Sequence, residues 1–151
     1  MVRPNTWQQR DVTAVPDCAG IDHADLSVDG RTVVFTAEFS GRAAVADIVS
    51  HGLLRTIDMP HRNTHMGPQD IKIAPDGSAY YIADSDEVGV WVLDGAATKM
   101  VRFIRTGKGA HGLYLSRDAR MLYVATGWKA ASACSSLHGS SSDKMENRKR
   151  R

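Results

Sequence analysis

The chain has 151 residues, 42% of them hydrophobic and 24% charged, a composition typical of one ordinary globular domain. Its formal net charge of +2 is too small to indicate a nucleic-acid-binding protein, and the basic excess lies in Lys129–Arg151, which has six basic residues against two acidic ones. No run approaches the roughly 20 apolar residues of a membrane-spanning helix, and Met1–Arg10 lacks the apolar segment of a secretory signal.

Three segments of the chain align with one another over their whole length. They are Leu26–Ile57, Ile71–Ile104 and Leu113–Thr126. An aspartate takes the same place in each segment, and a run of apolar and aromatic residues begins four positions after it. These aspartates are Asp29, Asp76 and Asp118. Each unit therefore predicts four short strands in succession, joined by turns and loops.

The predicted strands are rich in β-branched and aromatic residues. The earliest, Asp11–Val15, matches the end of the repeat and is expected to be the outer strand of a preceding, incomplete unit. The others are Leu26–Val28, Val33–Ala37, Ala43–Ile48, Leu54–Met59, Ile71–Ala74, Tyr80–Ala83, Val88–Leu93, Met100–Arg105, Leu113–Leu115 and Leu122–Thr126. Several are apolar on consecutive residues, which indicates sheets covered on both faces.

The first turn of each unit carries a further prediction. Asp29-Gly30 and Asp76-Gly77 place a glycine where the chain reverses at positive φ. The third unit has Asp118-Ala119 instead, so we expect a longer or different turn there.

Four short strands per unit, at a spacing of 42 to 47 residues, are typical of the blades of a β-propeller. A β-sandwich also has short strands and turns, but it does not require aspartates in register across three copies. The sequence predicts an all-β fold, a β-propeller fragment of four-stranded antiparallel blades. The expected divisions are an outer strand and leading loop of a preceding partial blade over 1–22, blades over 23–67 and 68–109, a half blade over 110–128, and a disordered basic tail over 129–151.

The tail prediction depends on an abrupt change of composition. A further strand is due near Ser136, but from Lys129 onward the chain consists largely of serine and basic residues. Such a change in the middle of a repeat is typical of a truncation or a change of reading frame. Two blade faces would then remain open to water, so we expect aggregation, ring-completing oligomers or dependence on a partner.

Several motifs in these repeats resemble those of YncE-like proteins, which are bacterial β-propellers of the YVTN-repeat, lactonase-like class. The resemblance is carried by His23–Gly30, Glu38–Gly41, Pro68–Asp70, Pro75–Gly77 and Thr106–Tyr114, and it extends over Asp11 to Thr126. It implies a ring that usually closes with seven blades, of which this chain would supply less than half. Family members are often exported, and they include lactone hydrolases, metal and cofactor enzymes and binding scaffolds, so the resemblance does not choose a function.

Histidines and aspartates near the expected inner strands are the candidate site residues. His23, His65 and His111 come just before these strands, where loops would gather around one mouth of the central channel. Imidazole suits metal ligation or proton transfer, although it also hydrogen-bonds neighbouring backbone. Aspartates near the same mouth could act as bases or cation ligands, or they could cap turns. They are Asp22, Asp25 and Asp70.

Five extra residues in the segment Pro60–Met66 interrupt the regular repeat and bring His65 with them. Extra loop residues on a β scaffold are a common location for binding sites. We therefore predict a ligand-binding set of His65, Asp70 and His111 that converges on a small ion or polar ligand. The alternative is an exposed loop whose histidines point apart.

The leading functional hypothesis is a non-catalytic β-propeller scaffold for binding or interaction. The alternatives are a lactonase-like hydrolase or metal-binding enzyme with His and Asp at the channel mouth, and a fragment without function. A complete catalytic set would be expected to draw on loops from several blades. Because this chain would supply less than half of the ring, this counts against an enzyme and favours the scaffold. The expected partners are a small ligand or protein at the channel mouth, or a second copy at the open faces. We expect no nucleic-acid partner and no membrane span. The sequence does not identify a cofactor or a cellular compartment.

Overall fold

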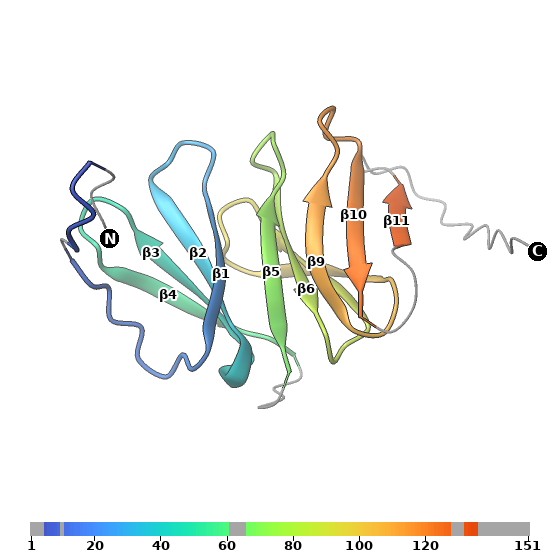
Figure 1. Ribbon diagram of the computed structural model, residues 1–151, viewed down its shortest axis with the longest axis horizontal. Helices are drawn as coiled ribbons and strands as arrows, with labels where there is room; N and C mark the ends of the chain where they lie inside the picture. The colour runs from blue at the N-terminus through green and yellow to red at the C-terminus, as the bar shows by residue number, and fades with distance from the viewer. Residues whose placement is uncertain (1–4, 10, 61–65, 128–131, 136–151) are drawn as a thin grey trace, which may run out of the picture.

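The computed structural model describes residues 5–9, 11–60, 66–127 and the backbone of 132–135. Its strands form three antiparallel sheets in which neighbours in sequence are also neighbours in the sheet (Figure 1). Blade 1 contains β1 (Ile21–Leu26), β2 (Thr32–Ala37), β3 (Arg42–Asp47) and β4 (Leu53–Asp58); blade 2 contains β5 (Pro68–Ile73), β6 (Ala79–Asp84), β7 (Gly89–Asp94) and β8 (Met100–Arg105); blade 3 contains β9 (Ala110–Leu115), β10 (Met121–Thr126) and β11 (Ser132–Ser135).

The three sheets stand side by side, and β1, β5 and β9 are adjacent, as the inner strands of propeller blades are (Figure 1). The helical residues in the described part of the chain form a single short 3-10 turn, η1 (Glu38–Ser40). The predicted all-β fold of consecutive antiparallel blades is confirmed.

Blades 1 and 2 repeat each other in register. Thr32 pairs with Asp47 in blade 1, and Ala79 pairs with Asp94 in blade 2. Both aspartates end a third strand and accept backbone N–H groups of the following turn, Asp47 from Ser50 and Asp94 from Thr98 at 2.6 Å each. The predicted equivalence of Asp47 with Asp94 is therefore confirmed.

The first turns of all three blades close alike, which corrects the expectation of a different turn in blade 3. The N–H groups of Gly30, Gly77 and Ala119 each donate to the carbonyl three residues earlier, at 2.8, 2.8 and 2.9 Å. Ala119 has φ 59°, close to 69° at Gly30 and 73° at Gly77. The repeat imposes the left-handed conformation on an alanine that does not favour it.

The core consists of two layers of apolar side chains between blades. The layer between blades 1 and 2 contains Val34, Val45, Ile71, Ile82 and Leu93. The layer between blades 2 and 3 is formed by Tyr81, Ala83, Val90, Val92, Leu113, Leu122 and Val124. Blade 2 is thus buried on both faces, as its consecutive apolar residues predict.

The inner strands begin earlier than predicted. β1, β5 and β9 start at Ile21, Pro68 and Ala110, where the sequence predicts starts at Leu26, Ile71 and Leu113. Each contains one residue more than the strand it pairs with over its first half, which is a β-bulge. Because a bulge interrupts the two-residue alternation of side chains, this half of each strand resembles a loop in the sequence.

Two predictions at the ends of the described chain are wrong. Asp11–Val15 forms no strand; it is held to blade 1 by contacts outside a backbone ladder, such as Asp11 Oδ2 at 2.6 Å from His51 Nδ1. Ser132–Ser135, expected within a disordered tail, forms β11 and pairs antiparallel with β10. Strand pairing uses backbone groups, so the open edge of β10 can pair with a segment that lacks β-branched residues. The rest of the predicted tail lies outside the described residues.

Candidate functional site

The inner strands form one wall of a hollow of about 430 Å3. Blades 1 and 2 contribute polar side chains to it, and blade 3 contributes small and aromatic ones. Its lining residues are His23 of β1, Asp70 and Lys72 of β5, Gly112, Leu113 and Tyr114 of β9, and Tyr123, Val124 and Ala125 of β10. The repeat brings them together because residues 23, 70 and 112 occupy the same position in successive blades, as do 72 and 114.

Asp70 is one of the predicted ligand-binding residues, and only 7% of it is exposed. Its Oδ1 accepts the N–H of Ile71 at 2.8 Å and lies 2.6 Å from Lys72 Nζ, which donates to it. Its Oδ2 accepts the N–H of Leu113 on β9 at 2.8 Å. Both carboxylate oxygens are therefore engaged, and the second bond joins blade 2 to blade 3.

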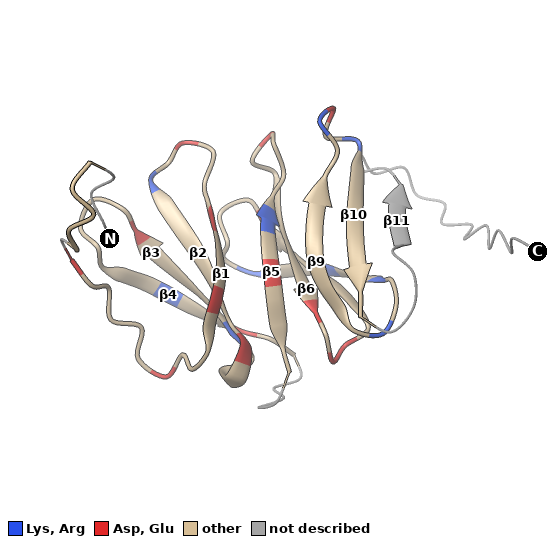
Figure 2. Cartoon of the chain, viewed as in Figure 1, with Lys and Arg blue, Asp and Glu red and all other residues tan. Residues whose placement is uncertain are grey.

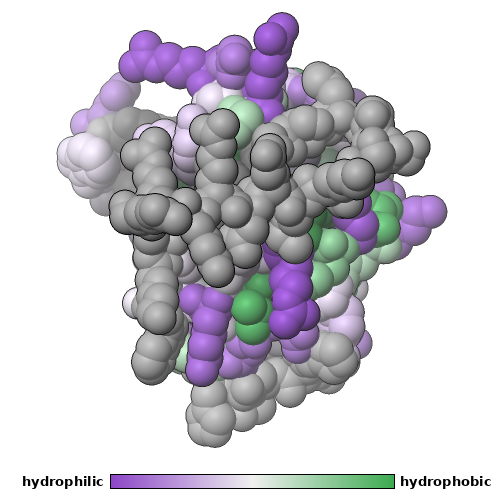
Figure 3. Space-filling view, turned by 90° about the vertical axis from the view of Figure 1, so that its right-hand side faces the viewer, coloured by the Kyte–Doolittle hydropathy of each residue, from purple (hydrophilic) through white to green (hydrophobic). Residues whose placement is uncertain are grey.

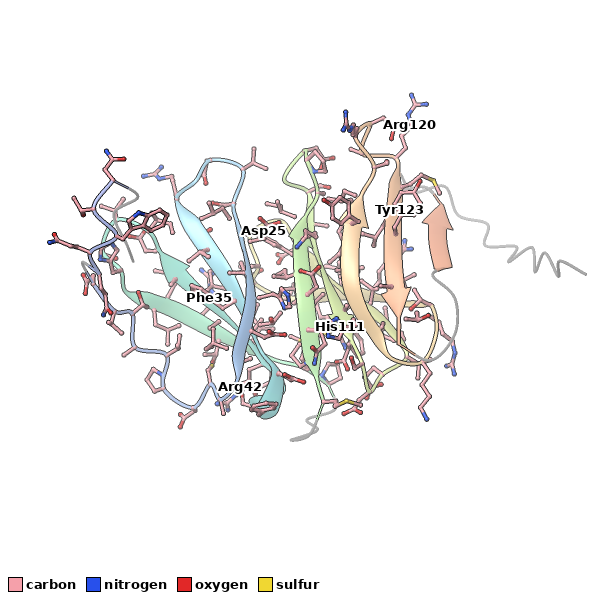
Figure 4. All side chains as sticks on the ribbon, viewed as in Figure 1. Asp25, Phe35, Arg42, His111, Arg120 and Tyr123 are labelled. Carbon is pink, nitrogen blue, oxygen red and sulfur yellow. The ribbon has the colours of Figure 1, made fainter. Side chains whose placement is uncertain are left out.

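Asp25 makes the same kind of bond one blade earlier. Its Oδ2 accepts the N–H of Ile73 on β5 at 2.8 Å, and its Oδ1 accepts the N–H of Leu26 at 2.9 Å. Asp25 lies between β1 and β5 (Figure 4). Carboxylates on two inner strands thus hold the next blade through its backbone. The sequence suggested that these aspartates act as bases, as cation ligands or as turn caps. It did not predict their hydrogen bonds to the backbone of the next blade.

His23 is the described histidine that lines the hollow. Its backbone N–H donates to Thr36 Oγ1 at 3.1 Å, and its Nδ1 lies 2.9 Å from Asp22 Oδ2. The two atoms are within ion-pair distance, but they lack the alignment of a hydrogen bond. Its side chain is 41% exposed, so the imidazole is accessible to a ligand in the hollow.

The other two predicted histidines are not brought together by the described structure. His111 lies on β9, one residue before Gly112, and is exposed (Figure 4). It is the extra residue of the β9 bulge, between Ala110 and Gly112, and it does not line the hollow. His65 lies outside the described residues. Within the described ranges, no group of three or more His, Cys, Asp and Glu side chains is placed to hold a metal ion.

Sequence reasoning also missed two tyrosines on the open face of blade 3. Tyr114 and Tyr123 lie directly opposite each other on β9 and β10, and they are 76% and 46% exposed. The next cross-strand pair on the same face is Gly112 with Ala125, so the two large tyrosine rings lie beside two small residues. Seen from this end, hydrophobic surface is visible between hydrophilic side chains and atoms drawn in grey (Figure 3).

Asp84, at the end of β6, is a buried carboxylate that the sequence reasoning did not single out. It accepts the indole N–H of Trp91 at 3.1 Å and the backbone N–H groups of Asp86 and Glu87 at 3.1 and 3.2 Å. Burial raises its pKa, although these hydrogen bonds oppose the shift. Its contacts are those of a residue that fixes the following turn.

No helix in the described part of the chain has the length and apolar character needed to cross a membrane. No protein-family model matches the sequence, and no curated protein matches it.

Solved structures do match the fold. Hydrazine synthase from Kuenenia stuttgartiensis has a TM-score of 0.69 and 21% identity, over 85% of this chain and 36% of that one. A protein from Lactobacillus plantarum has a TM-score of 0.69 and 19% identity, over 78% and 38%. A candidate 6-phosphogluconolactonase from Bacteroides uniformis has a TM-score of 0.68 and 16% identity, over 83% and 39%.

This chain covers less than two fifths of each of these proteins. Identities of this size show the fold alone, and proteins of such different names share it. The chain has the fold of consecutive blades of a β-propeller.

Proposed function

We propose that this chain is a non-catalytic β-propeller scaffold that binds a protein partner through the open face of blade 3. The observation that carries the proposal is a contrast between two residues in the same repeat position. Tyr81 of β6 is 5% exposed beneath blade 3, whereas Tyr123 of β10 is 46% exposed. Exposed aromatic side chains beside small residues are typical of surfaces that bind other proteins.

The geometry of Asp70 supports a scaffold over a hydrolase. His23 and Asp70 line the same hollow, which is the observation that favours a lactonase-like alternative. A general base needs a free lone pair within reach of the proton it removes. Asp70 is 7% exposed and its carboxylate already accepts three hydrogen bonds, one of them from the next blade, so about one of its four lone pairs is left for a substrate proton. We therefore assign this carboxylate to the joining of blades.

Two finer assignments belong to the same proposal. The repeat motifs support membership of the YncE-like, YVTN-repeat class. The mouth-side residues His65, Asp70 and His111 are proposed to contact the polar edge of the partner or a small ligand held there. The exposure of His111 on β9, beside the hollow-lining Gly112, supports this part.

The first test is turnover. The full chain is incubated with glucono-δ-lactone and γ-butyrolactone, and acid release is followed with a pH indicator. We expect no rate above that of buffer, with or without added divalent metal. Hydrolysis that disappears in both His23→Ala and Asp70→Asn, while their folds persist, would overturn the non-catalytic assignment.

The second test is binding. The wild-type chain, the Tyr114→Ser/Tyr123→Ser variant and a matched Val49→Ser/Val101→Ser variant are used to retain partner chains from the source cells. The matched variant removes two exposed apolar side chains away from the open face. Retention of the same partner by the wild type and the matched variant, with loss by the tyrosine variant, is the expected result. Equal retention by all three contradicts the proposed surface.

A further inference from the structure

Blades 1 and 3 carry the two halves of the interface that joins successive blades. Between blades 1 and 2, blade 1 presents the face that contains Val34 and blade 2 the face that contains Ile82. Between blades 2 and 3, blade 2 presents the face that contains Tyr81, the equivalent of Val34, and blade 3 the face that contains Val124, the equivalent of Ile82. Blade 3 ends the described series with the first kind of face, which contains Tyr123. Blade 1 begins it with the second kind, in which Phe35 occupies the position of Ile82 and Val124.

These terminal faces are more exposed than their internal equivalents. Ile82 and Val124 are completely buried, whereas Phe35 is half-buried. On the same face of blade 1, Leu26 and Ile21 are exposed. Two complementary apolar faces therefore stand at opposite ends of the described series of blades, and no described blade covers either of them.

The charges of the two ends are also complementary. Residues 11–58, which contain blade 1, have eight acidic residues against three basic ones. Residues 106–127, which contain β9 and β10 of blade 3, have three basic residues against the single acidic Asp118. Along the ribbon, red segments (Asp and Glu) are frequent at the blade 1 end, and blue segments (Lys and Arg) lie at the loops of blade 3 (Figure 2). Two copies docked by like ends would bring like charges together, whereas opposite ends attract.

We propose that the chain associates with a second copy of itself head to tail, with the β1–β2 face of one copy packed on the β9–β10 face of the other. The proposal rests on the proposed scaffold function and names its partner. The same pair of faces already meets twice within the chain, so the geometry of the contact is that of an internal blade interface. Such a heterologous contact continues into a ring or a longer assembly.

The N-terminal segment, residues 5–9 and 11–20, competes with the second copy. It lies on the face of blade 1 that the second copy would cover, because Val12 and Val15 face Ile21 and Phe35 across a hollow of about 390 Å3. It is held there by the contact of Asp11 with His51 and by a hydrogen bond of 2.9 Å from Arg42 Nη1 to the carbonyl oxygen of Asp17. The remaining hollow shows that the segment fills the place of a blade incompletely.

The inner strand of blade 3 also lacks the carboxylates that join the internal blades. Gly112 and Tyr114 stand on β9 at the positions of His23 and Asp25 on β1. Without a carboxylate acceptor there, the contact between copies depends on packing and charge. Association is therefore weaker than the internal interfaces and depends on concentration and salt.

The test is photo-cross-linking within the full chain. A benzophenone amino acid replaces Tyr123, and 15N-labelled and unlabelled copies are mixed so that cross-links between copies are identified by mass. The expected heavy–light products join position 123 to residues of β1 and β2. A probe at Val101, exposed on the outer strand β8, is the matched control and gives few such products.

Sedimentation measures the strength of association. The Arg117→Glu/Arg120→Glu variant is expected to weaken it about tenfold or more, whereas the same change of charge on β8, Arg102→Glu/Arg105→Glu, has a smaller effect. The His51→Ala variant, which loosens the N-terminal segment, is expected to strengthen it.

Heavy–light products that join position 123 to β9 or β10 of the other copy would overturn the head-to-tail arrangement. A chain that stays monomeric, with no heavy–light products, would overturn self-association. Either result leaves the scaffold function intact if the tyrosine variant still loses a different partner. Lactone hydrolysis that depends on His23 and Asp70 would overturn the scaffold function instead, whatever the cross-links show.

Discussion

Asp70 on β5 accepts the backbone N–H of Leu113 on β9 at 2.8 Å, and this bond crosses from one blade to the next. Asp25 on β1 makes a similar bond two repeat positions further along, to Ile73 on β5 at 2.8 Å. Apolar packing between blades is tolerant of small slips, whereas a directed bond from a carboxylate to one amide specifies the alignment of two strands. The inner strands are thus joined at fixed positions along the wall of the hollow.

The first prediction concerns this bond. Asp70→Ala removes the acceptor of a buried N–H and is expected to lower the free energy of unfolding by about 2–3 kcal/mol. Asp25→Ala, at a less buried position, is expected to cost about 1 kcal/mol. Urea denaturation measures both, and Asp76→Ala, at an exposed turn, is the matched control. A loss for Asp70→Ala no larger than that for Asp76→Ala would show that the bond contributes little.

The repeat aspartates show why the blade organisation could be predicted from the sequence. Asp29 and Asp118 each accept the N–H group two residues later in the same turn, at 3.1 and 3.2 Å. Such local bonds depend on residue type and spacing, both of which are visible in the sequence. The bonds of Asp25 and Asp70 to the next blade join residues more than 40 positions apart, so spacing within one blade does not reveal them.

The second prediction concerns the turn of blade 3. Ala119→Gly is expected to raise the free energy of unfolding by about 0.5–1 kcal/mol, because glycine adopts positive φ without the penalty that alanine has. Gly30→Ala is the reverse substitution in blade 1, and no atom lies within 4 Å of an added Cβ there. It is therefore expected to destabilise through backbone conformation alone. Thermal and urea unfolding check both signs, and a destabilised Ala119→Gly variant contradicts the explanation.

The candidate site was harder to predict than the repeat. The bulge in β9 places His111 within the strand and next to the hollow instead of in a loop before it. Tyr114 and Tyr123 have the same residue types as buried core tyrosines, and only the absence of a described blade over them makes them a surface. Exposure of this kind depends on what covers a face, which a pattern of residue types within one blade does not specify.

The third prediction concerns acid stability. Hydrogen bonds from Ser27 to Asp29, from Ser50 to Asp47 and from Ser116 to Asp118 lower the pKa values of these three turn carboxylates. A lowered folded-state pKa gives stability that is complete above the unfolded value of about 4 and is lost as the pH falls through the folded value.

The corresponding variant is Asp29→Asn/Asp47→Asn/Asp118→Asn, compared with the wild type by melting temperature from about pH 7 to about pH 2. We expect a lower melting temperature for the variant near neutral pH and convergence of the two curves in acid. Asp84, whose pKa is raised by burial, is present in both proteins and cancels in the difference. Parallel curves across the whole range would show that the turn bonds do not depend on ionisation.

The last prediction compares Tyr81 with Tyr123, which occupy one repeat position in two settings. Tyr81 is packed between blades 2 and 3, so Tyr81→Ala leaves a cavity and is expected to lower the free energy of unfolding by about 3 kcal/mol or more. Tyr123 lies on the open face of blade 3, so Tyr123→Ala is expected to change it by about 0.5 kcal/mol or less in dilute protein. At high concentration, Tyr123→Ala is expected to weaken self-association more than Tyr81→Ala does, because Tyr123 then lies in the interface between copies. Urea unfolding at low concentration and sedimentation at high concentration separate the two roles. A large loss of stability from Tyr123→Ala in the dilute monomer would mean that this face is already covered within the chain. The face would then not be available as a docking surface.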